Sequence, residues 1–187
     1  MSKSPQNHLD TRQPLVVDTT KLPRQPGATR ALRRVVPAPA DMGLELIGVP
    51  DGSDLELDLT LTSVSEGVYV SGRIRGSLTG ECGRCLNPID DSFDVQLAEL
   101  YAYEDSTTEE TTDSDEVGRM QGDLIDLEPA VRDAVVLTLP TNPVCRPDCP
   151  GLCPECGVHL DDLPADHRHE DVDPRWAALR NLSNNKE

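Results

Sequence analysis

The residues of this 187-residue chain best suited to chemistry are its six cysteines. The motif CGRC contains the first two and the run CRPDCPGLCPEC the other four: Cys82, Cys85, Cys145, Cys149, Cys153 and Cys156. Two cysteines separated by two residues can direct both sulfurs at one ion through a tight turn, and tetrahedral zinc takes four such ligands. The spacing therefore predicts one structural Zn²⁺ site.

The spacing leaves three ligand sets open for this zinc. One set joins the CGRC pair to Cys153 and Cys156, and another joins it to Cys145 and Cys149. The third set consists of the four C-terminal cysteines alone. The first two sets would tie the segment that contains CGRC to the later run, which would help to stabilise a chain with a modest apolar core.

Three histidines follow the cysteine run in the sequence. His159 could replace one thiolate as a ligand, because neutral imidazole also binds zinc. We expect His167 and His169 to lie in solvent. The predicted metal ligands are therefore the six cysteines, with His159 as a substitute.

Other cysteine chemistry offers an alternative, a metal-dependent iron–sulfur or redox enzyme. Part of the C-terminal run has the C-x3-C-x2-C spacing of radical iron–sulfur enzymes, but the chain is short for the barrel that such enzymes use. The CGRC pair lies between strand-like runs and does not open a helix, as a thioredoxin-like motif would. The sequence contains no nucleophile elbow, phosphate loop or dinucleotide fingerprint. We therefore predict that the chain is not an enzyme.

The elements that position the CGRC pair are predicted to be β-strands. Leucines at positions 55, 57, 59 and 61 alternate with polar residues, which gives one apolar and one solvated face. The same period of two continues over residues 68–78 and 93–101, on either side of CGRC. Short connections between consecutive runs predict an antiparallel meander of about four strands.

A helix is expected between the sheet and the C-terminal cysteine run. Asp126 is the predicted N-cap and Pro129 suits the first turn. Leu127, Val131 and Val135 fall on one helical stripe, and prolines follow it. A second short helix is expected over residues 173–182. The predicted fold class is therefore α+β: a small antiparallel β-sheet with one or two packed helices, a zinc staple and a flexible basic N-terminal arm.

Charge is distributed unevenly along the chain. Lys and Arg number 17 and Asp and Glu 34, so the net charge is −17, and such a body repels a phosphate backbone. Residues 1–36 are nevertheless basic. A helix over residues 28–34 would gather Arg30, Arg33 and Arg34 on one face, where, with Arg24, they could bind RNA phosphates. The same arginines could instead pair with the acidic body.

The expected organisation has three parts. Residues 1–36 form a basic, partly disordered arm, residues 37–160 form a single α+β domain with an acidic, solvated loop at 104–116, and residues 161–187 form a C-terminal tail with the short helix. No apolar run approaches the length of a membrane span, and no hydrophobic signal segment opens the chain. We therefore expect a cytoplasmic protein, whose reducing surroundings favour metal binding over disulfides.

Five stretches share a pattern with a known family: residues 26–47, the CGRCL turn, the segment GDLIDLEPAVRDAVVLTLP, the run CRPDCPGLCPECG and the segment DPRWAALRNL. Together they resemble the YceD family, the large ribosomal RNA subunit accumulation proteins. His159 stands where the family usually has asparagine. The resemblance implies a non-enzymatic ribosome-biogenesis factor that supports synthesis, processing or stability of large-subunit ribosomal RNA. It implies precursor ribosomal RNA or large-subunit ribosomal proteins as partners, with no membrane and no small-molecule substrate.

Overall fold

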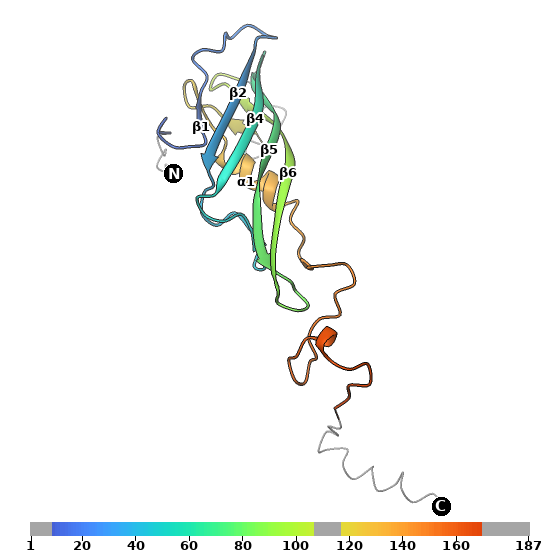
Figure 1. Cartoon of the computed structure of the whole chain (residues 1–187). Helices are drawn as coiled ribbons and strands as arrows, with labels where there is room; N and C mark the ends of the chain where they lie inside the picture. Colours follow the sequence, from blue (N-terminus) through green and yellow to red (C-terminus); the bar gives the residue numbers. More distant parts are fainter. Residues whose placement is uncertain (1–8, 107–116, 170–187) are drawn as a thin grey trace, which may run out of the picture. The chain divides into compact units, whose positions relative to one another are not determined.

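The structure is a computed structural model that describes residues 9–106 and 117–169 (Figure 1). The chain divides into two compact units, residues 1–83 with 87–145 and residues 84–86 with 146–187. The expected helix over 173–182 and most of the expected acidic loop, residues 107–116, lie outside the described residues. Within the described residues, no helix is long and apolar enough to cross a bilayer.

The first unit contains a six-stranded sheet of order β2-β4-β5-β6-β7, with β3 paired to β5 outside this path. Its strands are β2 (Thr29–Pro37), β3 (Ile47–Gly48), β4 (Asp54–Val64), β5 (Gly67–Glu81), β6 (Pro88–Ala102) and β7 (Gly118–Arg119). All pairs are antiparallel except β6 with β7, which is parallel. The predicted antiparallel meander is confirmed for β4, β5 and β6, whereas the parallel β7 makes the sheet mixed.

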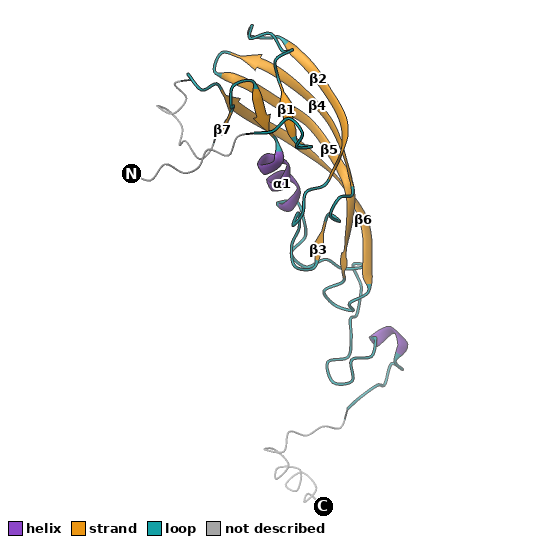
Figure 2. Cartoon of the chain, turned by 90° about the vertical axis from the view of Figure 1, so that its left-hand side faces the viewer, coloured by secondary structure: helices purple, strands orange, loops and turns teal. Residues whose placement is uncertain are grey.

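The core lies on the inner face of this sheet, which α1 (Glu128–Val136) covers on the concave side (Figure 2). The alternating leucines of β4 are all buried, and the residues between them are exposed or half-exposed. Val70 and Ile74 of β5 and Val131 of α1 have no exposed surface. The period-two pattern is thus confirmed as the signal of a one-sided strand.

The start of α1 differs by one position from the expectation. Leu127 is the N-cap, and Asp126 precedes it, so the prediction of Asp126 as N-cap is wrong. The Asp126 side chain still accepts a hydrogen bond from the backbone N–H of Glu128 at 2.9 Å, which satisfies one of the donors that a helix leaves unpaired at its first turn. Leu127, Val131 and Val135 are buried, as the predicted stripe requires.

The N-terminal segment is part of the folded unit. Residues 29–37 form strand β2, so the helix expected over 28–34 is wrong. This strand pairs along its whole length with β4, and the buried Leu32 and Val36 point to the core. A second pairing, between β1 (Val16–Asp18) and β8 (Leu124–Asp126), holds residues nearer the N-terminus. The expectation of a flexible arm over 1–36 is therefore wrong for the residues of β1 and β2, because pairing with other strands decides their conformation.

The second unit, over its described residues 84–86 and 146–169, contains little regular structure. The Leu152 N–H donates to the Arg84 carbonyl at 3.1 Å, and Leu152 forms an isolated bridge with His159. Gly151 has a φ of +87° and would place a Cβ 2.9 Å from the Arg84 oxygen, so this close approach requires glycine. A single turn of 3-10 helix covers Leu160–Asp162.

Candidate metal centres

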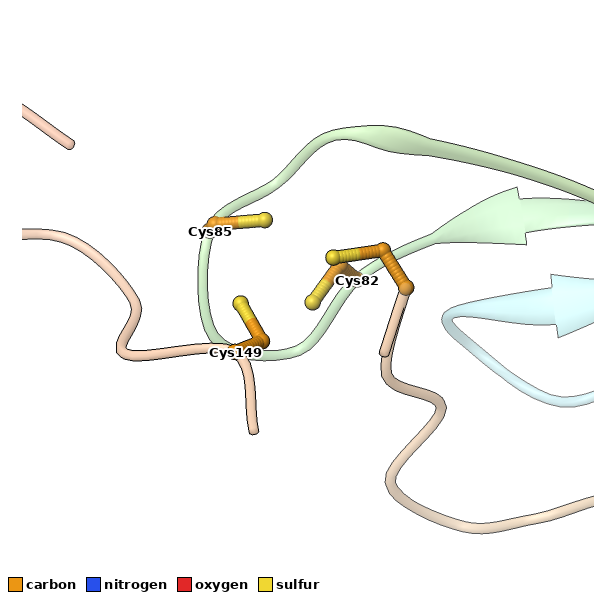
Figure 3. A group of neighbouring side chains, drawn as sticks. Cys82, Cys85 and Cys149 are labelled. Carbon is orange, nitrogen blue, oxygen red and sulfur yellow. The ribbon is translucent and has the colours of Figure 1, made fainter. Parts of the chain in front are cut away.

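Four cysteines converge at the end of the hairpin formed by β5 and β6. The sulfurs of Cys82, Cys85, Cys145 and Cys149 all lie within 4.8 Å of one another, and Figure 3 shows the side chains of the labelled three pointing toward one another. Cys82, Cys85 and Cys149 are buried, whereas Cys145 is exposed. None of the six cysteines, all of which the structure describes, forms a disulfide.

This four-cysteine group corresponds to the second of the three ligand sets that the spacing left open. Tetrahedral zinc with bonds of about 2.3 Å to sulfur places neighbouring sulfurs about 3.8 Å apart. The four sulfurs are close enough to reach that separation through small side-chain shifts. The group could therefore hold a metal ion, and the donor set, four thiols, suits a soft or borderline ion.

Backbone hydrogen bonds shape the turn that presents the first two sulfurs. The Cys82 N–H donates to the Asn87 carbonyl at 2.8 Å and closes the end of the hairpin. Leu86 has a φ of +62°, in the left-handed region that side chains with a Cβ seldom occupy. The Gly83 N–H donates to the Pro143 carbonyl at 2.8 Å, two residues before Cys145. These bonds bring segments that lie far apart in the sequence to one turn.

A second group gathers Cys153, Cys156, His167 and His169, whose ligand atoms also lie within 4.8 Å of one another. His167 is half-buried and His169 is exposed, and both belong to this group, whereas His159 belongs to neither group. The described residues thus present two groups that could hold a metal ion, where one site was expected. The motif H-x-H a short distance after CPEC was the available sequence signal.

The backbone around Cys153 favours the ionised form of its thiol. The N–H groups of Cys156 and Glu155 donate to its sulfur and lower the pKa of Cys153 to about 6. The turn is closed by a bond from the Gly157 N–H to the Cys153 carbonyl at 2.8 Å, and Gly157 has a φ of +69°. Since the thiolate is the form that binds metal, the turn is suited to present a ligand.

Two of the four arginines predicted to bind RNA make ion pairs within the chain. Arg24 lies 3.1 Å from a carboxylate oxygen of Asp123, and its guanidinium stacks over the ring of Tyr103, 4.9 Å from the centroid. Arg33 lies 3.0 Å from a carboxylate oxygen of Asp58. These contacts correspond to the alternative in which the arginines pair with the acidic body.

Arg30 and Arg34 lie on strand β2, so they do not share a helical face with Arg33. Arg30 donates to the backbone carbonyl of Asp18 at 3.0 Å. Arg34 makes no ion pair within the described part of the chain. Arg33 points to the opposite side of β2 from Arg30 and Arg34, because side chains alternate along a strand. The RNA-binding role of the four arginines stays a prediction.

Comparison with known proteins places these features in a family. The family model described as "Large ribosomal RNA subunit accumulation protein YceD" matches residues 70–183, which include both Cys/His groups. The stretch over residues 26–47, which also prompted the resemblance, lies outside the matched residues. No solved structure has significant similarity to the chain.

Relatives from several bacteria match most of the chain. "Uncharacterized protein Rv2926c" of Mycobacterium tuberculosis is 55% identical over 166 residues, which span 89% of this chain and 80% of that protein. "Uncharacterized protein ML1660" of Mycobacterium leprae is 45% identical over 177 residues, which span 95% of this chain and 80% of the relative. "Uncharacterized protein YlbN" of Bacillus subtilis is 26% identical over 110 residues, 58% of this chain and 62% of that protein.

Proposed function

The chain belongs to the YceD family of large ribosomal RNA subunit accumulation proteins, and we propose that it is a cytoplasmic, non-enzymatic ribosome-biogenesis factor. In this proposal it supports the synthesis, processing or stability of large-subunit ribosomal RNA. The family's printed name describes the accumulation of an RNA and no reaction.

We further propose that the four-cysteine group holds a structural Zn²⁺. Cys82, Cys85, Cys145 and Cys149 would supply four thiolates, and a zinc with four protein ligands has no open position for a substrate. Such an ion acts as a cross-link between the hairpin turn and the segment after α1. The burial of three of the four thiols supports this role, because buried thiols that converge within 4.8 Å of one another and of a fourth suit a site closed to solvent.

The partner that the charges favour is a basic large-subunit ribosomal protein. The observation that supports this choice is the pairing of Arg24 and Arg33 with carboxylates of the chain itself, against a net charge of −17. A phosphate backbone would have to displace those carboxylates and approach an acidic surface. A cationic protein is attracted to the same acidic surface.

The experiment compares binding of the full chain to precursor large-subunit ribosomal RNA and to purified large-subunit ribosomal proteins over a range of salt concentrations. We expect salt-sensitive binding to one or more basic ribosomal proteins. We expect RNA to bind weakly. The triple variant Arg30→Gln with Arg33→Gln and Arg34→Gln should change this RNA affinity no more than a control variant that loses the same number of positive charges. That control is Arg73→Gln with Arg75→Gln and Arg146→Gln.

Direct RNA contact through β2 would give the opposite result. The Arg30, Arg33 and Arg34 variant would then lose RNA affinity and show a shallower salt dependence than the control, with unchanged zinc content. Depletion of the protein in its host tests the broader proposal, because the amount of large-subunit RNA should fall relative to small-subunit RNA. An unchanged ratio would contradict a role in accumulation.

Metal analysis of protein purified without oxygen separates this proposal from the iron–sulfur or redox enzyme. Zinc without iron supports a structural site. Iron accompanied by inorganic sulfide would overturn it and support the enzyme.

A further inference from the structure

We propose that Cys153, Cys156, His167 and His169 form a second zinc site, independent of the four-cysteine group, in which Glu155 positions one of the histidines. All five residues belong to the second unit. This inference does not depend on what the protein binds, and it raises the expected zinc content from one ion per chain to two.

The distances between sulfur and nitrogen match a tetrahedral ion. The sulfur of Cys153 lies 3.3 Å from Nε2 of His169, and the sulfur of Cys156 lies 3.7 Å from Nε2 of His167. A zinc bonded to sulfur at about 2.3 Å and to nitrogen at about 2.05 Å separates these atoms by about 3.6 Å. Both imidazoles present the same ring nitrogen, Nε2, to the sulfurs.

The second nitrogen of His169 also has the partner that a metal-bound histidine requires. Its Nδ1 lies 3.4 Å from a carboxylate oxygen of Glu155. Histidines that bind zinc commonly donate their other N–H to a carboxylate, which fixes the tautomer and aims the free nitrogen at the ion. Because Glu155 lies between Cys153 and Cys156, one short turn would supply two thiolates and this carboxylate.

The orientation of the two imidazole rings allows both to bind one ion. The ring centroids of His167 and His169 lie 4.5 Å apart, and the ring planes meet at 87°. Nearly perpendicular rings can bring both Nε2 atoms to one ion without stacking on each other. Two thiolates and two neutral imidazoles also balance the charge of Zn²⁺, whereas four thiolates leave a net charge of −2.

The rest of the second unit gives a physical reason for this site. Over residues 84–86 and 146–169, every buried side chain is that of a cysteine, and Val158 and Leu160 are exposed. A segment that buries so little apolar surface cannot offset the entropy of ordering its backbone by packing alone. Zinc binding can supply that free energy.

The decisive experiment is the zinc content of the full chain and of three variants, measured by mass spectrometry of the native protein. We expect two zinc ions for the wild type and for the control His159→Asn. We expect one for His167→Asn with His169→Asn and one for Cys82→Ser with Cys85→Ser. The retained ion in the histidine variant also shows that the variant is folded around the first site.

Three results would overturn the inference. One is a histidine variant that holds as much zinc as the wild type. The other is a wild type with a single zinc that the Cys82 and Cys85 variant loses, which would leave the four-cysteine site standing alone. A wild type without zinc would contradict both sites.

Cobalt substitution distinguishes the ligand sets. The intensity of sulfur-to-cobalt charge transfer rises with the number of thiolates bound, so loss of the second site should remove about one third of the wild-type intensity and loss of the first about two thirds.

Glu155→Gln should weaken the second site by about 10- to 100-fold without changing the cobalt spectrum, as expected of a positioning residue. A zinc affinity of Glu155→Gln equal to that of the wild type would remove Glu155 from the proposal. In contrast to the His167→Asn with His169→Asn variant, His169→Cys should still bind the ion at the second site, with added charge-transfer intensity.

Discussion

The two units of the chain obtain their order from different sources. In the first unit, strand β4 alone buries four leucines, and α1 adds Val131 and Val135 to the same core. In the described part of the second unit, only cysteine side chains are buried. The comparison teaches that one chain can combine a region stabilised by the hydrophobic effect with a region that buries too little apolar surface to be stabilised in the same way.

Removal of metal should have the largest effect and should separate the two regions. After treatment with a strong chelator, the amides of Leu152, Cys153 and Gly157 should lose their protection from hydrogen exchange, because each zinc contributes on the order of 10 kcal/mol. Amides of β4 and β5 should stay protected by their core. If the chelated protein kept full protection over 151–160, metal would not be the source of order there.

Breaking only the four-cysteine site sharpens the same comparison. Cys82→Ser with Cys85→Ser should release one zinc, lower the melting temperature and expose the amides around Cys149, while Gly157 stays protected by the second site. Calorimetry and hydrogen exchange on the double variant test this. An unchanged melting curve and metal content would show that the two cysteines do not bind the ion.

A substitution in the core of the sheet should destabilise the first unit. Leu59 is 1% exposed, and Leu59→Ala should reduce the free energy of unfolding of the first unit by about 2–5 kcal/mol. Urea unfolding monitored by the β-sheet signal measures the loss. Zinc content under native conditions should equal that of the wild type, and a loss of zinc would show that metal binding depends on the core of the first unit.

The smallest effect is expected for an apolar residue of the second unit. Leu160 is 37% exposed, and Leu160→Ser should change stability by no more than about 0.5 kcal/mol, with zinc affinity unchanged. Chelator competition and thermal unfolding measure both quantities. A loss as large as that of Leu59→Ala would show that the second unit has an apolar core after all.

The success of sequence reasoning follows the same division. The strands around Leu59 and Ile74 were predictable because burial on one face leaves a period of two, and the stripe of α1 was predictable for the corresponding reason. The helix over Arg30–Arg34 was wrong because pairing with β4 decides the conformation of that segment. The sequence could not show which cysteines meet, since the choice depends on how the hairpin turn and the segment at Pro143 come together.

The histidines illustrate a different limit. His167 and His169 lie in a polar stretch without periodicity, so only the H-x-H spacing shortly after CPEC could suggest ligands there. Their place beside other ligand-type side chains became visible only in the structure, where a turn sets Cys153, Cys156 and Glu155 against them. In a region without an apolar core, spacing between ligand-type residues is the only available signal.

The separation of Cys85 from Cys145 in the chain also sets an order of events during biosynthesis. About 60 residues lie between them, so at about 10 residues per second the first two thiols wait roughly six seconds for Cys145 and Cys149 to emerge. All residues of the hairpin that presents Cys82 are synthesised before then. Every newly made molecule therefore passes through a stage in which Cys82 and Cys85 are present without Cys145 and Cys149, and free thiols at that stage are open to oxidation.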